Sequence, residues 1–275
     1  MWLYLFRVKS RGACLRRGGE CKSEGMRLII RLIAVVLMGW PAYAQETTFK
    51  NPVEAKLSVN RRDYNRNSIG GSFEVENFYP VGWSRDGKFA YYLEPVDEAC
   101  GCYFGKLVIL DLKNDAVVWQ FDYTSEDDSE VSKKPKTLAA LWAANRKLFS
   151  AKLTENKIEP QRAARVLPFP ITYKSDRVTP TLHVERKQMN KDDRIYGDVG
   201  RATVELNSRR NGSKTVFDEK YAEAMPLYVG MLGYLRSPLE PRAAIILVEI
   251  YRGYEGPPHV ASVRIVGAAL DKNFR

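Results

Sequence analysis

The chain has few of the residues on which common kinds of site depend. It contains 4 cysteines and 2 histidines in 275 residues, and only Cys100 and Cys102 follow residue 44. So few cysteines exclude a disulfide-stapled scaffold, and the sequence has no Gly-x-Ser-x-Gly, phosphate-cradling loop or His-Glu-x-x-His motif. No apolar run is long enough to cross a bilayer core of about 30 Å. The sequence therefore predicts no cofactor, no metal site and no stable membrane span.

Positive charge is unevenly distributed along the chain, whose formal net charge is +10. Residues 1–25 hold six Lys/Arg and two Glu, and Arg27 and Arg31 add two more positive charges, which leaves +4 for residues 45–275. Phosphate backbones are bound by a concentrated basic patch or stripe. Because the remaining surplus is small and scattered, we expect no nucleic-acid partner.

Residues 26–44 have the pattern of a secretory signal peptide. Arg27 and Arg31 are joined to an apolar run that ends in a small-x-small site. That order of basic, apolar and small residues is the export signature, and it predicts cleavage between Ala44 and Gln45. We therefore expect a bacterial protein that is periplasmic or secreted after cleavage.

The chain carries a basic extension ahead of this signal. Residues 1–25 contain six Lys/Arg and two cysteines, and an ordinary signal peptide needs no such preface. Two interpretations remain open. Either Met26 is the true start, or Met1 begins an unusually long basic leader.

Hydrophobic periodicity predicts a mainly β domain. Residues 45–77 are a polar, extended lead-in that pairs only late, and residues 78–275 form the globular domain. Within it, alternating apolar residues predict a blade-like β unit at 78–123 and a second β unit at 170–270. Between them, apolar residues at helical spacing predict a helix at 137–155. We expect two twisted antiparallel sheets of blade-like hairpins with this one amphipathic helix packed on them.

A tight hairpin is the best-defined local motif. The run WSRDGKFAYY begins at Trp83 and places Asp86-Gly87 between an aromatic strand and an apolar one. Glycine supplies a positive φ and Asp bonds its own backbone, so this pair predicts the turn. Ser84 and Asp86 can cap that turn, while Trp83 and Phe89 would face the same core.

This hairpin resembles the blade repeat of TolB-type, WD40-like β-propellers, and the resemblance covers residues 78–121. A fainter internal similarity relates the segment that begins at Gly82 to the segment that begins at Gly233, and each is followed by an apolar strand that reaches Glu94 or Glu249. A propeller usually needs four or more blades. The resemblance therefore implies a propeller-like pair of sheets that close their edges by packing against each other.

The C-terminal part of the chain carries a second resemblance. Segments 233–238, 252–258 and 266–268 are similar to those of a family of uncharacterised, predicted secreted bacterial proteins. Members of that family also combine an Asp-Gly hairpin with a middle helix. This resemblance implies export, and it brings no known activity.

Cys100-Gly101-Cys102 is the first candidate for chemistry, in a loop between two hairpins. In a regular strand, residues i and i+2 have Cα atoms about 6.6 Å apart, near the limit of disulfide geometry, and Gly101 allows a sharper bend. In an oxidising compartment this predicts a local disulfide. Metal ligation, and a pair of inert or redox-exchangeable thiols, remain as alternatives.

The two histidines differ in context. His183 lies on the polar side of a predicted strand, as a surface histidine does. His259 follows the Gly-Pro-Pro segment, near enough to Glu255 for an acid–base pair, although Gly-Pro-Pro is first of all a rigid turn.

The chain is rich in tyrosine, with 15 in all. Tyrosine offers a large contact area and a hydroxyl, so an exposed set would suit contact with a protein or a glycan. The alternative is that the tyrosines pack the edges of the sheets. The residues concerned are Tyr91, Tyr92, Tyr103, Tyr228, Tyr234, Tyr251 and Tyr254.

These observations predict an exported envelope protein of unknown biochemical activity. We expect a non-catalytic interaction or accessory module whose partner is another envelope protein or a glycan. The alternative is a small periplasmic enzyme or metal-binding protein that uses Cys100, Cys102, Glu255 and His259. The two hypotheses differ in whether those four residues meet in one pocket.

Overall fold

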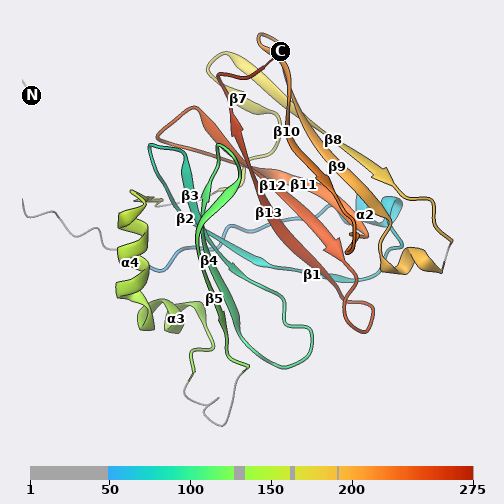
Figure 1. The fold of residues 1–275 in the computed structure, drawn as a ribbon, viewed down its shortest axis with the longest axis horizontal. Helices are drawn as coiled ribbons and strands as arrows, with labels where there is room; N and C mark the ends of the chain where they lie inside the picture. The colour runs from blue at the N-terminus through green and yellow to red at the C-terminus, as the bar shows by residue number, and fades with distance from the viewer. Residues whose placement is uncertain (1–48, 127–133, 162–164, 191, 275) are drawn as a thin grey trace, which may run out of the picture. The chain divides into compact units, whose positions relative to one another are not determined.

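Strands dominate the structure, and the predicted mainly β class is confirmed (Figure 1). The predicted signal peptide and its cleavage site at Ala44 and Gln45 lie outside the described residues. Within the part of the chain that the structure describes, no helix is long and apolar enough to span a membrane. This computed structural model describes residues 49–126, 134–161, 165–190 and 192–274.

The first sheet along the chain, here called the helix-covered sheet, is an antiparallel meander of four strands. A short fifth strand, β6 (Glu159–Pro160), pairs with the free side of β2. The four strands are β2 (Asn77–Trp83), β3 (Lys88–Glu94), β4 (Phe104–Asp111) and β5 (Ala116–Thr124).

Two further sheets follow in the second half of the chain. The outer sheet is a meander of β7 (Ile171–Tyr173), β8 (Asp176–Arg186), β9 (Val199–Ser208) and β10 (Gly212–Lys220). The central sheet contains β11 (Tyr228–Arg236), β12 (Arg242–Tyr251) and β13 (His259–Ala269). The strand β1 (Phe73–Val75) pairs with β13 in parallel, so the polar lead-in does pair late, as predicted.

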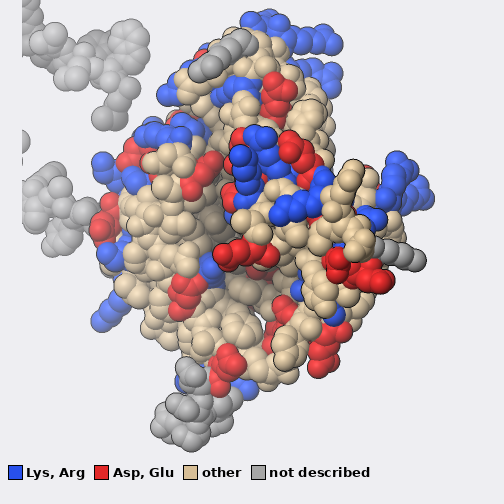
Figure 2. Space-filling view, turned by 45° about the vertical axis from the view of Figure 1, so that its right-hand side comes forward, with Lys and Arg blue, Asp and Glu red and all other residues tan. Residues whose placement is uncertain are grey.

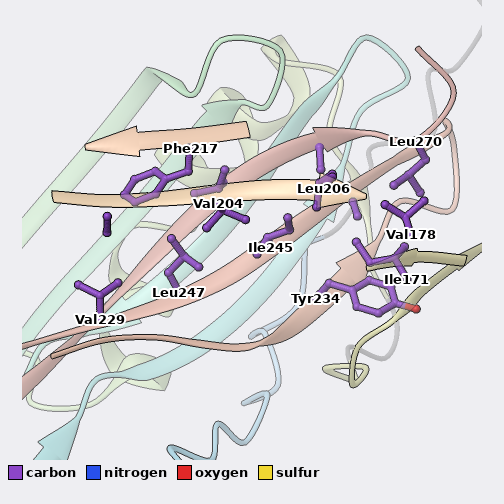
Figure 3. Close-up of a cluster of buried hydrophobic side chains, with 14 of the residues drawn as sticks. Ile171, Val178, Val204, Leu206, Phe217, Val229, Tyr234, Ile245, Leu247 and Leu270 are labelled. Atoms are coloured by element: carbon purple, nitrogen blue, oxygen red, sulfur yellow. The ribbon is translucent and has the colours of Figure 1, made fainter. Parts of the chain in front are cut away.

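The central sheet packs against a different sheet on each of its faces. Successive side chains of a strand point to opposite faces, and in β12 both sets are buried and, apart from Arg242 and Glu249, mostly apolar. Ile245 contributes to a core shared with Val204 of the outer sheet (Figure 3). Ile246 contributes to a core shared with Phe89 and Val108 of the helix-covered sheet. The three sheets are therefore stacked, with the central sheet in the middle (Figure 1).

The number of sheets is a correction to the expected pair. The alternating residues between 170 and 270 suggest one β unit, but the chain leaves β10 at Lys220 and enters a different sheet at Tyr228. Periodicity gives the strands and not their pairing, because a sheet is defined by which backbones bond to each other.

Two helices cover the far face of the helix-covered sheet where one was predicted. They are α3 (Leu138–Ala144) and α4 (Arg146–Glu155), and their buried Trp142 and Phe149 pack on Leu107 of β4. Asn145 separates the helices, and its side-chain amide donates to the Leu141 carbonyl at 3.0 Å. Asparagine competes for backbone groups in this way, which explains why the helical pattern is interrupted here.

The lead-in at 45–77 is more ordered than predicted. It contains a short helix, α2 (Arg61–Asn67), whose N-cap Asn60 accepts bonds from the backbone N–H groups of Arg62 and Asp63. Tyr64 is its one buried residue. A helix with a single buried side chain has no apolar period to detect, so only the capping asparagine could have indicated it.

The internal similarity of the sequence corresponds to a repeated hairpin plan. The β2–β3 pairing contains an irregularity between Pro80 and Gly82, and the β11–β12 pairing contains one between Met231 and Gly233. The glycine that follows each irregularity, Gly82 or Gly233, lies against the backbone of another segment. A Cβ on Gly82 would come within 2.2 Å of the Glu159 carbonyl oxygen, and a Cβ on Gly233 within 2.5 Å of the Leu167 oxygen.

Candidate functional site

Cys100 and Cys102 are joined by a disulfide in an exposed loop, with their Cα atoms 5.1 Å apart. Asp97 organises this loop, because its carboxylate accepts hydrogen bonds from the backbone N–H groups of Ala99, Cys100 and Cys102 at 3.1–3.2 Å. Slight burial raises the pKa of Asp97, but these N–H groups together lower it below its usual value. The loop is thus held by local bonds.

Glu255 and His259 lie in different environments. Glu255 is exposed, whereas His259 is buried and its Nδ1 accepts a hydrogen bond from the backbone N–H of Gly253 at 3.3 Å. Burial lowers the pKa of His259. No hydrogen bond or ion pair joins Glu255 to His259 in the described structure. The acid–base pair that the sequence left as the lesser alternative is therefore not formed.

The loops that carry these candidates nevertheless touch each other. The backbone N–H of Tyr254 donates to the Glu98 carboxylate at 2.7 Å, which connects the disulfide loop to the Gly-Pro-Pro loop. Among the described residues, no group of three or more His, Cys, Asp or Glu side chains is arranged to hold a metal ion. Cys100, Cys102, Glu255 and His259 also line neither of the cavities of about 630 Å³ and about 310 Å³ in this structure.

The predicted turn of the first hairpin is held by Ser84, Asp86 and Gly87. The Ser84 hydroxyl accepts a bond from the Lys88 N–H at 2.8 Å and donates to Asp86, while Gly87 has a φ of 96°. Hydrogen bonds from Lys88 and then from Ser84 lower the pKa of Asp86. These residues serve the hairpin, and Trp83 and Phe89 face one core as expected.

Most of the tyrosines near the hairpins belong to the core. Tyr91, Tyr92, Tyr228 and Tyr234 are buried, and of the seven only Tyr254 is largely exposed, at 82%. The aromatic residues therefore do not form the contact surface that their number suggested. They pack the sheets, which was the alternative interpretation.

A groove of about 630 Å³ lies where the central and outer sheets diverge. Pro180–Arg186 of β8 lines one side, Tyr228–Leu232 of β11 lines another, and polar residues around α2 close a third. The lining is chemically mixed. Leu182, Val184 and Met231 are apolar, whereas Asn60 and Asp63 are polar. The groove therefore offers both apolar contacts and several polar groups.

Both strands that line the groove have a free backbone edge there. Strand β8 pairs with β9 on one side, and its pairing with β7 ends at Val178. Strand β11 pairs with β12, and within the described part of the chain its other edge is joined only at Tyr234, by Leu167. From Thr179 to Glu185, and from Tyr228 to Leu232, no described residue is hydrogen-bonded to the outward backbone groups.

Fixed charges stand at one end of the groove. Asp63 of α2 accepts a 2.6 Å bond from the Tyr228 hydroxyl, and burial, then this bond, raise the pKa of Tyr228. Arg186 is bonded to the buried Asp198 and reaches the Leu227 carbonyl at 3.4 Å. One carboxylate, Asp63, and one cation, Arg186, therefore lie beside the free edge of β11. Asp63 is held by Tyr228 and Arg186 by Asp198.

No signal in the sequence identified this groove. Its one local indication is Pro180, because proline lacks an N–H and is confined to the edges of sheets. The pairing of sheets was needed to see that two such edges meet. On the face that Figure 2 shows, Lys/Arg and Asp/Glu side chains are interspersed.

Comparison of the chain with protein-family models, with curated proteins and with solved structures found no match.

Proposed function

We propose that this protein is an exported, non-catalytic binding module that captures an extended segment of a partner polypeptide by strand addition. The observation that carries the proposal is that the free edges of β8 and β11 line one groove. Unpaired N–H and C=O groups on a strand edge are a template for another strand. Main-chain bonds then supply affinity, and alternate side chains supply specificity.

The dimensions of the groove suit such a ligand. A segment of five or six residues in β conformation spans about 17–20 Å, and it would lie about 4.8 Å from the strand that it joins. The free stretches of β8 and β11 are of this length. Leu182 and Met231 offer apolar contacts, whereas Asp63 and Arg186 offer one charge of each sign.

The rest of the chain is consistent with a partner in the cell envelope. The signal-like segment at 26–44 favours export, and a disulfide at Cys100–Cys102 favours an oxidising compartment. The resemblance of residues 78–121 to a TolB-type blade, and of the C-terminal segments to predicted secreted proteins, supports the same proposal of an exported accessory module. Its partner would be an envelope protein rather than a glycan, because the exposed tyrosines that a glycan would need are few.

The test removes one outward donor from β8. Pro180 is tolerated in β8 because its nitrogen faces the free edge, so Leu182, two residues on, presents its N–H to the same edge. Peptides selected on the purified protein by phage display should bind Leu182→Pro about tenfold more weakly. The matched variant Leu182→Ala keeps the N–H and should lose less. Fluorescence polarisation with labelled peptides measures both.

Hydrogen exchange on the unmodified protein gives an independent reading that does not depend on a variant folding. A bound peptide should protect amides of β8 between Thr179 and Glu185, or of β11 between Tyr228 and Leu232. Protection confined to other strands, or equal affinity for a folded Leu182→Pro, would refute strand addition in this groove.

A further inference from the structure

A second cavity, of about 310 Å³, lies where all three sheets meet. Its walls come from the β4–β5 turn of the helix-covered sheet, from β10 of the outer sheet, and from the ends of β12 and β13 in the central sheet. It shares no lining residue with the groove. Its size corresponds to about ten water molecules, so it admits a small solute and not a polypeptide.

The lining is rich in cationic groups. Four positively charged side chains and one carboxylate line the cavity, namely Lys113, Lys214, Arg242, Lys272 and Asp115. They come from separate segments that only the fold brings together. Over the whole of residues 45–275 the surplus of positive charge is only +4, so this local excess is unlike the chain as a whole.

Arg242 forms the base of the cavity and is only 5% exposed. Its Nη1 donates to the Leu112 carbonyl at 2.7 Å, and among the described residues that is the one hydrogen bond of the guanidinium. The Nε atom lies 3.3 Å from Glu240 Oε1, but neither atom has a well-formed hydrogen bond. A buried guanidinium with spare donors is suited to an oxyanion, because its planar fork matches two oxygens at once.

Lys214 brings a second positive charge to the wall. Its Nζ donates to the backbone carbonyls of Ala269 and Lys272, which fixes the ammonium group beside the cavity. Burial, and then the neighbouring Arg242, lower the pKa of Lys214 to about 8. Glu240 pairs with Arg242 through Nε at 3.3 Å, whereas Nη1 is bonded to Leu112, so an anion in the cavity would face the ammonium of Lys214 together with the remaining donors of Arg242.

Asp115 supplies the one acidic group, at the rim. Its Oδ1 accepts a 2.7 Å bond from the Gly267 N–H, which leaves the other oxygen for a ligand. Partial burial raises the pKa of Asp115 to about 6, so it is a carboxylate in slightly alkaline buffer. A carboxylate repels a fully ionised anion, but it accepts a hydrogen bond from an anion that has kept a proton.

We propose that this cavity binds a small protonated oxyanion of the phosphate type, held by Arg242 and the surrounding lysines and selected by Asp115. Hydrogen phosphate retains one proton in neutral solution, whereas sulfate retains none. The lysines and the arginine attract either ion, so the choice between them falls to Asp115.

The experiment measures binding of inorganic phosphate and of sulfate to the purified protein by titration calorimetry at about pH 7.5 and constant ionic strength. Phosphate should bind in a saturable manner, about tenfold more tightly than sulfate. Lys272→Gln should weaken phosphate binding several-fold. Lys147→Gln, which removes an exposed lysine of α4, is the matched control and should change nothing.

Asp115→Asn separates selection from attraction. An amide can still accept the Gly267 N–H, and it can donate to either anion, so the preference for phosphate over sulfate should vanish while phosphate binding persists. Absence of saturable phosphate binding at tens of millimolar would overturn the proposal. So would an unchanged preference in Asp115→Asn, or an equal loss of affinity in Lys147→Gln.

Discussion

The β2–β3 and β11–β12 hairpins follow one plan, but their outer edges are treated differently. The edge of β2 is bonded by Ala55 to Phe78, by Gln161 to Val81, and by β6. Among the described residues, the edge of β11 is bonded by Leu167 alone, and none of them is bonded to the outer edge between Tyr228 and Leu232. The outer edge of the first hairpin is therefore covered, whereas part of the outer edge of the second can still pair with another strand.

The unbonded edge of β11 is where a binding function can lie, because the corresponding edge of β2 is already occupied by other segments of the chain. Natural proteins cover or blunt the edges of their sheets, since an open edge invites pairing with another chain. The groove contains two partial defences, Pro180 and the irregularity before Gly233. They limit pairing with arbitrary strands and leave room for a specific one.

The largest expected effects test whether the central sheet is equally held on its two faces. Ile245 packs toward the outer sheet and Ile246 toward the helix-covered sheet, and both are fully buried. Truncation of a buried isoleucine leaves a cavity and destabilises by about 2–5 kcal/mol. We expect Ile245→Ala and Ile246→Ala to lower the free energy of unfolding by similar amounts, measured by urea denaturation.

A marked asymmetry between these variants would break the picture of a stacked unit. If Ile245→Ala had little effect while Ile246→Ala was severe, the outer sheet would be loosely attached. The groove at its margin would then be a product of that looseness. The two residues are adjacent in the chain and chemically identical, so each serves as the control for the other.

Glycine can be required for lack of space or for a positive φ, and the glycines of the two hairpins differ in this respect. Gly82 is crowded by the Glu159 backbone without a positive φ, Gly233 is crowded by Leu167 at a φ of 143°, and Gly101 has a φ of 65° with open space around it. Alanine at Gly101 should cost about 1 kcal/mol, from conformation alone. Gly82→Ala should cost about 2–3 kcal/mol and Gly233→Ala about 3–4 kcal/mol, by steric clash and added strain.

Thermal and urea unfolding of the three variants measure this order. A Gly233→Ala protein as stable as Gly101→Ala would show that Leu167 does not press on β11. The two hydrogen bonds between Leu167 and Tyr234 that join this edge would then be in doubt, and the two hairpins would differ even more than the structure indicates.

The sequence could predict whatever depends on neighbours along the chain. Asp86-Gly87 predicted the hairpin, and the nearly continuous apolar run at 243–251 predicted β12. It could not predict that the chain changes sheet after Lys220, because pairing depends on distant partners. The groove and the cationic cavity could not be predicted for the same reason. Arg242 and Lys214 carry no motif, and only the fold places them around one cavity.

The long loops that follow the two hairpins extend the comparison. Between β3 and β4 the chain is tied by the Cys100–Cys102 disulfide, whereas between β12 and β13 it ends by burying His259. A covalent link is indifferent to mild acid, but a buried imidazole is not. The second loop should therefore make the fold sensitive to pH in a range where the first does not.

The smallest expected effect is this pH dependence. Burial lowers the pKa of His259 in the folded protein, so as pH falls below about 6.5 the unfolded chain takes up the proton first. The free energy of unfolding should then decrease between about pH 7.5 and about pH 5.5, with a slope of at most about 1.4 kcal/mol per pH unit. His259→Gln should remove this decrease and leave only the opposite contribution of Asp115, whose pKa burial raises to about 6, whereas His183→Gln, at the exposed histidine, should keep the decrease. Urea unfolding at several pH values measures both, and a decrease of the same size in His259→Gln would mean that acid acts elsewhere than at this loop.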